Sequence, residues 1–174
     1  MLMKALVVYS SLTGNTKKVA EAVAEVVPGC DLFPVQEAPA SVEGYDLVIA
    51  GYWVDKGMPD GRTCKWLEGV KNARVAFFGT LGAWPDSDHA RDCMAKGEAL
   101  VKEPARGNTV FGSWLCQGRI DPKVIEVMAR MAADVHPMTP ERKARIEEAA
   151  KHPDAADCRR AQEFIRKVLD AVQP

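Results

Sequence analysis

The sequence lacks several features that would place it in a special class of protein. No stretch approaches the ~20 apolar residues that cross a bilayer, and no apolar leader with a cleavage site precedes the first strand-like run. The formal net charge is only −1, which argues against a strongly basic surface for nucleic acid. We therefore expect a cytoplasmic protein that binds neither nucleic acid nor membrane.

Metal-binding and disulfide patterns are also missing. The cysteines are odd in number and form no C-x-x-C pair, which argues against a disulfide framework or a zinc site. They are Cys30, Cys64, Cys93, Cys116 and Cys158. The histidines His89, His136 and His152 have no carboxylate or cysteine at ligand spacing, which favours surface or capping roles. We predict reduced cysteines, no metal site and no catalytic side chain.

Short apolar runs recur along the 174 residues and predict five β-strands. The predicted strands are Ala5–Tyr9, Asp31–Val35, Leu47–Gly51, Val75–Phe78 and Thr109–Leu115. Several are continuously apolar, as is typical of parallel strands that are covered on both faces. Helical patterns lie between most of them, including Asp86–Val101 with Ser87 or Asp86 as its N-cap. The alternation predicts a doubly wound α/β fold, with a parallel sheet and helices on both faces.

Beyond the fifth predicted strand the chain is longer than a minimal five-stranded unit requires. One helix is predicted from Asp121, a second after a Thr139 cap, and a last one after an Asp154 cap. No linker or repeat separates a second domain. We expect a single domain over residues 1–174, with a helical insert at about 121–153.

The stretch YSSLTGNTKKVA joins the first predicted strand to a helix through several hydroxyl groups and one glycine. A helix N-terminus presents unpaired N–H groups and partial positive charge, so it binds anions well. The turn therefore predicts a phosphate site, although a plain turn capped by Ser11 or Thr13 is the alternative. Neither the nucleotide P-loop nor the dinucleotide fingerprint occurs. The candidate phosphate-binding residues are Ser10, Ser11, Leu12, Thr13, Gly14, Asn15 and Thr16.

YSSLTGNTKKVA resembles the phosphate loop of flavodoxins, which bind flavin mononucleotide (FMN) with a T/S-x-T-G-x-T turn after the first strand. The resemblance in topology extends over residues 1–118 and the final helix. It implies a flavodoxin-like sheet of order 2-1-3-4-5, with FMN at the switch point between strands one and three. It also implies an electron-transfer flavoprotein that passes electrons between a reductase and a redox enzyme.

Two glycine-containing segments, GYWVDKGMPDG and GTLGAWPDSDH, follow the third and fourth predicted strands, and each carries a tryptophan. In flavodoxins these loops enclose the flavin ring, which implies Trp53 and then Trp84 as stacking residues; the alternative for each is packing on the domain surface. Lys56-Gly57 matches a peptide that changes orientation when the flavin is reduced. The stretch Cys116-Gln117-Gly118-Arg119 follows the fifth predicted strand, and one interpretation is that it borders the same crevice. A plain surface charge is the favoured interpretation of Arg119. The implied ring-binding residues are Trp53, Val54, Lys56, Gly57, Thr80, Leu81, Gly82 and Trp84.

The chain departs from typical flavodoxins in two ways. Its charge is nearly neutral, so the acidic docking face of that family is not expected. Its segments WVDKG and HPMTPER resemble a short-flavodoxin subgroup, some of whose members are associated with reductases of bile pigments. A bile-pigment reductase is therefore one candidate among the redox partners.

Two alternatives to an electron carrier stay open. An FMN-dependent NAD(P)H or quinone reductase would have the same fold, which by itself does not separate carrier from enzyme. A phosphoacceptor receiver domain would share the strand order but needs clustered aspartates at the ends of its first and third strands. This chain has Tyr9-Ser10-Ser11 and Gly51-Tyr52 there, which favours the carrier.

Overall fold

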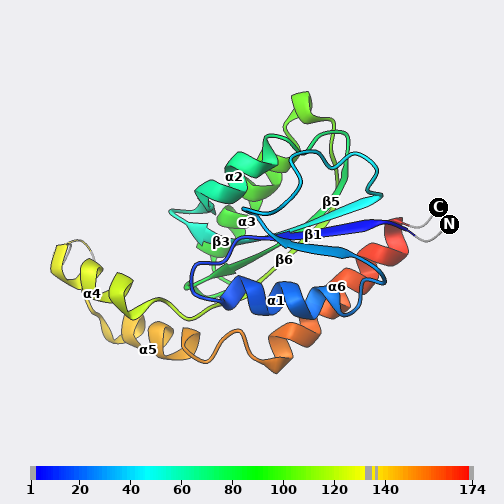
Figure 1. Ribbon diagram of the computed structural model, residues 1–174. Helices are drawn as coiled ribbons and strands as arrows, with labels where there is room; N and C mark the ends of the chain where they lie inside the picture. Colours follow the sequence, from blue (N-terminus) through cyan, green and yellow to red (C-terminus); the bar gives the residue numbers. More distant parts are fainter. Residues whose placement is uncertain (1–2, 132–134, 136, 173–174) are drawn as a thin grey trace.

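The computed structural model describes residues 3–131, 135 and 137–172. Within these residues, parallel strands form the centre of the molecule in the order β2-β1-β3-β5-β6 (Figure 1). These strands are β1 (Ala5–Tyr9), β2 (Asp31–Pro34), β3 (Leu47–Asp55), β5 (Arg74–Leu81) and β6 (Thr109–Gln117). A short strand, β4 (Met58–Pro59), pairs antiparallel with the end of β3. The predicted order 2-1-3-4-5 is confirmed for the parallel strands, whereas β4 was not predicted.

Helices cover both faces of the sheet (Figure 1). The helices α1 (Asn15–Ala24) and α6 (Ala155–Val172) pack on one face, and α2 (Gly61–Leu67) and α3 (Asp88–Val101) pack on the other. A 3₁₀ turn, η1 (Pro104–Arg106), precedes β6. The predicted doubly wound α/β class is confirmed.

The two cores follow from the alternation of side chains along each strand. Ala5 and Val7 of β1 pack toward α1 and α6, whereas Leu6 and Val8 pack toward α2 and α3. All four side chains are buried. A strand between two helical layers must therefore be apolar on both sides, which explains the continuous apolar run in the sequence.

Three strands are longer than the sequence patterns predict, and one of them is β6, which continues to Gln117. β3 continues to Asp55 because its end pairs with β4, and β5 continues to Leu81 because Thr80 pairs with Trp53. Trp53 and Thr80 therefore lie on strands, not in the long loops that were predicted. The connection from Val35 to Asp46 contains turns and no helix.

The helices α4 (Pro122–Met131) and α5 (Pro140–Ala149) extend beyond the sheet on the side where β1 ends (Figure 1). The Thr139 hydroxyl caps α5 as predicted, accepting a hydrogen bond from the Arg142 N–H group at 3.2 Å. α4 has no buried residue, and α5 buries only Ala149. That this region is an insert in a single domain stays a prediction. None of the described helices combines the length and apolar composition of a bilayer span.

The cysteines are all described by the structure, and none is in a disulfide. Burial raises the pKa of each thiol, most strongly for Cys116, which lies in the core beneath α6. A raised pKa keeps a thiol protonated and unreactive. The prediction of reduced, packed cysteines agrees with these surroundings.

Candidate functional site

A cavity of about 440 Å³ opens where β1, β3, β5 and β6 end. Ligands bind at this edge of open α/β sheets, beside the strands between which the chain order reverses. We call it the first cavity, and most of the predicted site residues line it. They are Ser11, Leu12, Thr13, Asn15, Thr16, Trp53, Val54, Lys56, Thr80, Leu81 and Gly82. The fold thus brings together three segments that are distant in sequence.

The turn between β1 and α1 leaves the helix N-terminus without a side-chain cap. Gly14 is the N-cap residue, with a left-handed φ of 98°, and no described side chain caps the helix from this position. Ser11 instead accepts a hydrogen bond from the Gly14 N–H group at 3.1 Å, within the turn. Leu12 and Thr13 are exposed. Ser11 therefore caps the turn at Gly14, as the alternative expects in part, while the first turn of α1 has N–H groups of the kind that bind an anion.

The lysines near this turn have other partners. The Lys17 ammonium lies 3.8 Å from the Glu21 carboxylate, one helical turn away. The Lys18 ammonium donates a hydrogen bond of 2.6 Å to the Pro153 carbonyl. An anion bound at the turn would therefore depend on N–H groups and hydroxyl groups.

Asp60 is a buried carboxylate that the sequence predictions missed. It caps α2 by accepting hydrogen bonds from the N–H groups of Arg62 and Thr63 at 3.1 and 3.3 Å. The Asp60 carboxylate also accepts hydrogen bonds from the Ser10 and Thr63 hydroxyls, each at 2.8 Å. The Asp60 backbone N–H group donates a hydrogen bond of 3.1 Å to the Trp53 carbonyl. Ser10 therefore uses its hydroxyl to join β1 to α2. An aspartate directly before a helix is an N-cap signal that could have identified Asp60.

Two further side chains attach the turn to neighbouring strands. The hydroxyls of Thr16 and Thr80 are buried and hydrogen-bonded at 2.9 Å. The Asn15 amide donates to the Arg119 carbonyl at 2.9 Å, and a Cβ atom at Gly118 would lie 2.7 Å from that amide nitrogen. The Arg119 side chain is exposed, as interpreted, but the residue also borders the cavity.

The segment after β3 is a tight hairpin. Asp55 pairs with Met58, and the two residues between them, Lys56 and Gly57, have φ values of 50° and 81°. Positive φ at both central residues is typical of two-residue hairpins that match the twist of the strands. Lys56 is exposed at the border of the first cavity. Gly57 is buried, and a Cβ atom added there would lie 3.7 Å from the Lys96 ammonium.

Four predicted residues do not line the first cavity: Ser10, Gly14, Gly57 and Trp84. Trp84 lines a neighbouring cavity instead, and its side chain is 42% exposed. Conversely, the segment from β6 into α4 lines the first cavity, although none of its residues was among the predicted site residues. The lining residues of this segment are Gly118, Arg119, Ile120, Asp121, Val124 and Met128, and Asp55 at the end of β3 also lines the cavity.

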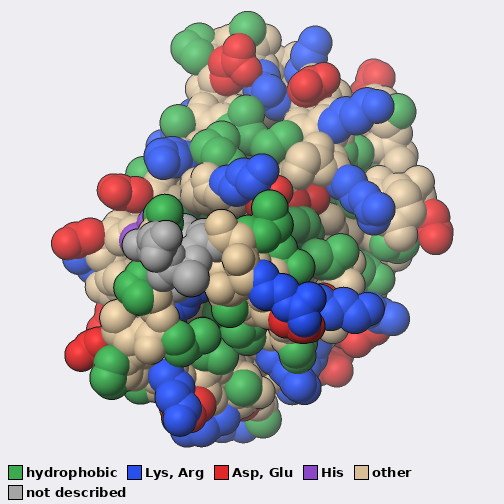
Figure 2. All heavy atoms as spheres, turned by 90° about the vertical axis from the view of Figure 1, so that its left-hand side faces the viewer, with side chains coloured by type: hydrophobic (Ala, Val, Ile, Leu, Met, Phe, Trp, Pro, Cys, Tyr) green, Lys and Arg blue, Asp and Glu red, His purple; other side chains and the backbone are tan. Residues whose placement is uncertain are grey.

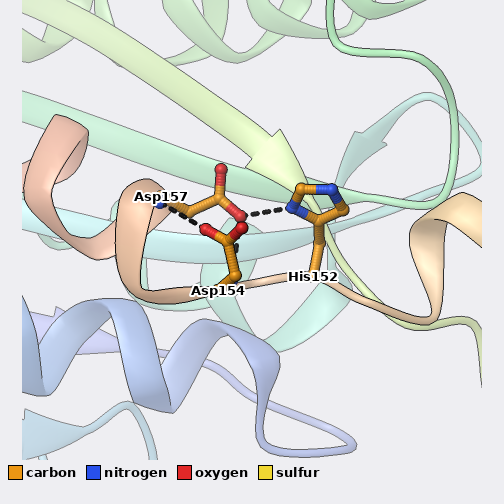
Figure 3. A group of neighbouring side chains, drawn as sticks. All are labelled: His152, Asp154 and Asp157. Carbon is orange, nitrogen blue, oxygen red and sulfur yellow. Dashed lines mark hydrogen bonds and ion pairs between the residues drawn. The ribbon is translucent and has the colours of Figure 1, made fainter.

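His152 lies in a cluster of charged groups next to the site (Figure 3). Its Nδ1 atom lies 2.5 Å from the Asp157 carboxylate, and the Nε2 atom of His89 lies 3.6 Å from the Cys93 sulfur. The expectation that these two histidines have no carboxylate or cysteine at ligand spacing was therefore wrong. Asp154 and Asp157 each accept the other's N–H group, at 2.8 and 2.9 Å, which is a reciprocal cap of α6. The three side chains meet for this structural reason. His136 lies outside the described residues.

The Asp157 carboxylate raises the pKa of His152 above its ordinary value, because it accepts a hydrogen bond from the imidazole. The His152 carbonyl accepts the Arg119 N–H group at 3.0 Å, so the cluster supports the segment that borders the cavity. Since the folded-state pKa is raised, the stabilisation is fully present below the unfolded pKa, near 6.5. It is lost as the pH rises through the folded pKa.

We expect His152→Asn to lower the free energy of unfolding by roughly 1 kcal/mol at pH 6 and by less at pH 9, because only the charged imidazole gains from Asp157. Urea unfolding of both proteins at the two pH values measures the difference. His89→Asn is the control, because His89 is exposed on α3. A loss that is the same at both pH values would show that protonation of His152 contributes nothing.

Comparison with known proteins identifies the family. The flavodoxin domain matches residues 6–166, which is most of the chain. The chain belongs to the flavodoxin family. Membership separates this flavodoxin-family protein from phosphoacceptor receiver domains, which share its strand order.

Similar proteins match this flavodoxin-family protein over much or nearly all of its length. Flavodoxin-like domain-containing protein BilS of Clostridioides difficile (strain CD3) is 33% identical over 177 residues, covering 96% of this chain and 97% of the relative. Oxidised flavodoxin 1 from Bacillus cereus is 17% identical with a TM-score of 0.60, over 96% of this chain and 97% of that one. A flavoprotein from Lactobacillus acidophilus NCFM in complex with FMN is 20% identical with a TM-score of 0.54, over 65% and 93%. Likeness to these two solved structures shows the fold alone.

Proposed function

We propose that this flavodoxin-family protein binds FMN in the first cavity and carries electrons between a reductase and a redox enzyme. Family membership supports a flavin-binding redox role. The flavoprotein from Lactobacillus acidophilus that shares the fold was solved with FMN, which supports this choice of flavin.

The observation that carries the proposal is the composition of the first cavity. One part of its lining is the uncapped N-terminal turn of α1, and another is the half-buried indole of Trp53. FMN has a matching polarity, because a phosphate is joined by a short chain to a flat ring that is apolar on its faces. Thr13, Asn15 and the first-turn N–H groups would hold the phosphate, and Trp53 would contact the ring.

When bound, the flavin supplies the electron-transfer chemistry, while the protein supplies binding, orientation and electrostatic surroundings. Lys56 places a positive charge at the border of the cavity, which favours an occupant with negative charge. The buried Thr16–Thr80 pair and the Asn15–Arg119 hydrogen bond hold the lining segments in position before a ligand arrives. Preorganisation of this kind lowers the cost of binding.

An FMN titration followed by stepwise anaerobic reduction tests the proposal. We expect a yellow complex with one FMN per chain and weaker binding of riboflavin, which lacks the phosphate. Reduction of the bound flavin by NADPH should require an added reductase. Failure to bind FMN would contradict the proposal, and rapid NADPH oxidation by the protein alone would favour the reductase alternative.

The partners belong to the same proposal. We propose a reductase as electron donor and a redox enzyme as acceptor, in the cytoplasm. A reductase of bile pigments is the first acceptor to test, because the WVDKG and HPMTPER segments resemble flavodoxins associated with such enzymes.

A further inference from the structure

A second cavity lies beside the first. It has a volume of about 730 Å³ and is bordered by the segment after β5, by α4 and by α5. The two cavities share Gly82, Ile120, Val124 and Met128 in their linings. A volume of this size is in the range that binds organic ligands. An occupant of the second cavity would therefore border an occupant of the first.

Much of the wall of the second cavity is apolar. Trp84 contributes an exposed indole, Ile125 and Met128 come from α4, and Ile146 comes from α5. Described residues cover the apolar side of α4 only in part: none of its residues is buried, and Met131 is 83% exposed. One contact on this side is a hydrogen bond of 3.6 Å from the Arg142 guanidinium to the Met128 sulfur. Figure 2 views this side of the molecule and shows hydrophobic side chains interspersed with Lys and Arg side chains. Apolar surface that stays exposed next to a cavity is typical of a binding site.

Two arginines of α5 add positive charge to this apolar wall. Arg142 and Arg145 are three residues apart, so they lie on the same side of the helix, and both line the cavity. The Nε atom of Arg145 is buried and has no hydrogen-bond partner among the described residues. A buried donor without a partner is costly, so the guanidinium of Arg145 has hydrogen-bonding capacity that the described residues leave unused.

The two arginines share the described lining of the second cavity with a single carboxylate. Burial lowers the pKa of Arg145, and the neighbouring Arg142 charge lowers it further. The carboxylate is that of Glu141, whose pKa is lowered by hydrogen bonds from its own backbone and from Thr139, which hold it at the start of α5. His89 is the remaining titratable group of the lining.

We propose that the second cavity binds an apolar organic acid, with its carboxylate on Arg145 and its apolar body against Trp84 and α4. Arginine suits this role because its planar group binds a carboxylate through two parallel hydrogen bonds. None of the charged residues of the second cavity lines the first, so charge substitutions test the two sites separately even though the cavities share apolar lining residues.

Isothermal titration calorimetry on the full chain tests this site, with 1-pyrenebutyric acid and the neutral 1-pyrenebutanol as matched probes. We expect the acid to bind about 10- to 100-fold more tightly than the alcohol, the range of a hydrogen bond to a charged group. Arg145→Gln should abolish that preference. Trp84→Ala should weaken the binding of both probes, because it removes apolar contact that they share.

Lys143→Gln is the matched control, because it removes the same charge from the exposed side of α5, where Lys143 lies 3.9 Å from Glu147. It should leave the preference for the acid unchanged. Equal affinities for the two probes, or an equal effect of Lys143→Gln, would overturn the proposal. If neither probe binds, the proposal is wrong.

The titrations are repeated with and without saturating FMN in the same preparation. Circular dichroism of each variant confirms that it is folded. If the acid binds at Arg145 while FMN does not bind, the proposed function fails and the second site stands. If FMN binds and the acid does not, the second site fails and the proposed function stands.

Discussion

The Asp60→Ala variant should lose roughly 3 kcal/mol of unfolding free energy, because one substitution removes both a helix cap and a buried hydrogen-bond acceptor. The Asp60 side chain is 1% exposed and accepts four hydrogen bonds, two from N–H groups of α2 and two from hydroxyls. After the change, the hydroxyls of Ser10 and Thr63 would be buried without their partner. Leaving such groups unsatisfied costs more than the hydrogen bonds contribute. Chemical unfolding in urea measures the loss.

The same substitution should weaken FMN binding in the protein that remains folded. Ser10 directly precedes the turn that would hold the phosphate, and the Asp60 N–H group is hydrogen-bonded to the Trp53 carbonyl at 3.1 Å. Asp60 thus connects the two parts of the first cavity without lining it. We expect an increase in the dissociation constant of FMN of about tenfold, since small misplacements of binding groups are enough to lose one hydrogen bond.

Two variants separate the contributions of Asp60. Asp60→Ser keeps a capping oxygen but is too short to serve all four donors, so it should recover part of the loss. Ser87→Ala removes the cap of α3, where the hydroxyl accepts a single N–H group at 3.2 Å, and should cost about 1 kcal/mol. If Asp60→Ala costs no more than Ser87→Ala, the buried network around Asp60 contributes nothing beyond an ordinary cap.

The parts of the fold that sequence patterns predict are those with a local cause. Apolar runs such as Ala5–Tyr9 form parallel strands. The capping residues Ser87 and Thr139 predict where α3 and α5 begin. The full length of β3 could not be predicted in this way, because its last residues are in a strand only through pairing with Pro59 and Met58. That pairing depends on a Lys-Gly turn, which is a weaker hairpin signal than Asn-Gly or Asp-Gly.

In the predicted site, too, features with a local cause could be predicted and features that depend on distant residues could not. The turn around Gly14 was recognisable because its residues are adjacent in sequence, but the use of its side chains was not. Ser10 bonds to a residue 50 positions away and Asn15 to one 104 positions away, so only the folded chain reveals their partners. The α4 pattern predicted a helix, but not that its apolar side would remain exposed beside a cavity.

Trp53 and Trp84 looked alike in sequence, and the structure separates them. Each lies in a glycine-containing segment after a predicted strand. Trp53 is held within the sheet by its pairing with Thr80 and lines the first cavity, whereas Trp84 lies beyond the end of β5 and lines the second. The two tryptophans should therefore respond to different ligands.

Trp53→Ala should weaken FMN binding by roughly 30- to 100-fold, because burial of an aromatic face contributes about 2–3 kcal/mol. It should also increase the fluorescence of the bound flavin, since an indole in contact with the ring quenches its emission. Riboflavin binding should weaken by the same factor, because the change does not alter the contacts of the phosphate. Fluorescence titrations with both flavins measure these effects.

Trp84→Ala is the matched control for this prediction, since it removes the same side chain from the neighbouring cavity. It should change FMN affinity by less than about threefold, which is within ~0.7 kcal/mol. An unchanged flavin emission in Trp53→Ala, or a larger loss of affinity in Trp84→Ala, would place the ring against α4 and not against β3. The first cavity would then hold only the phosphate end of the cofactor, and the second would not be free for an organic acid.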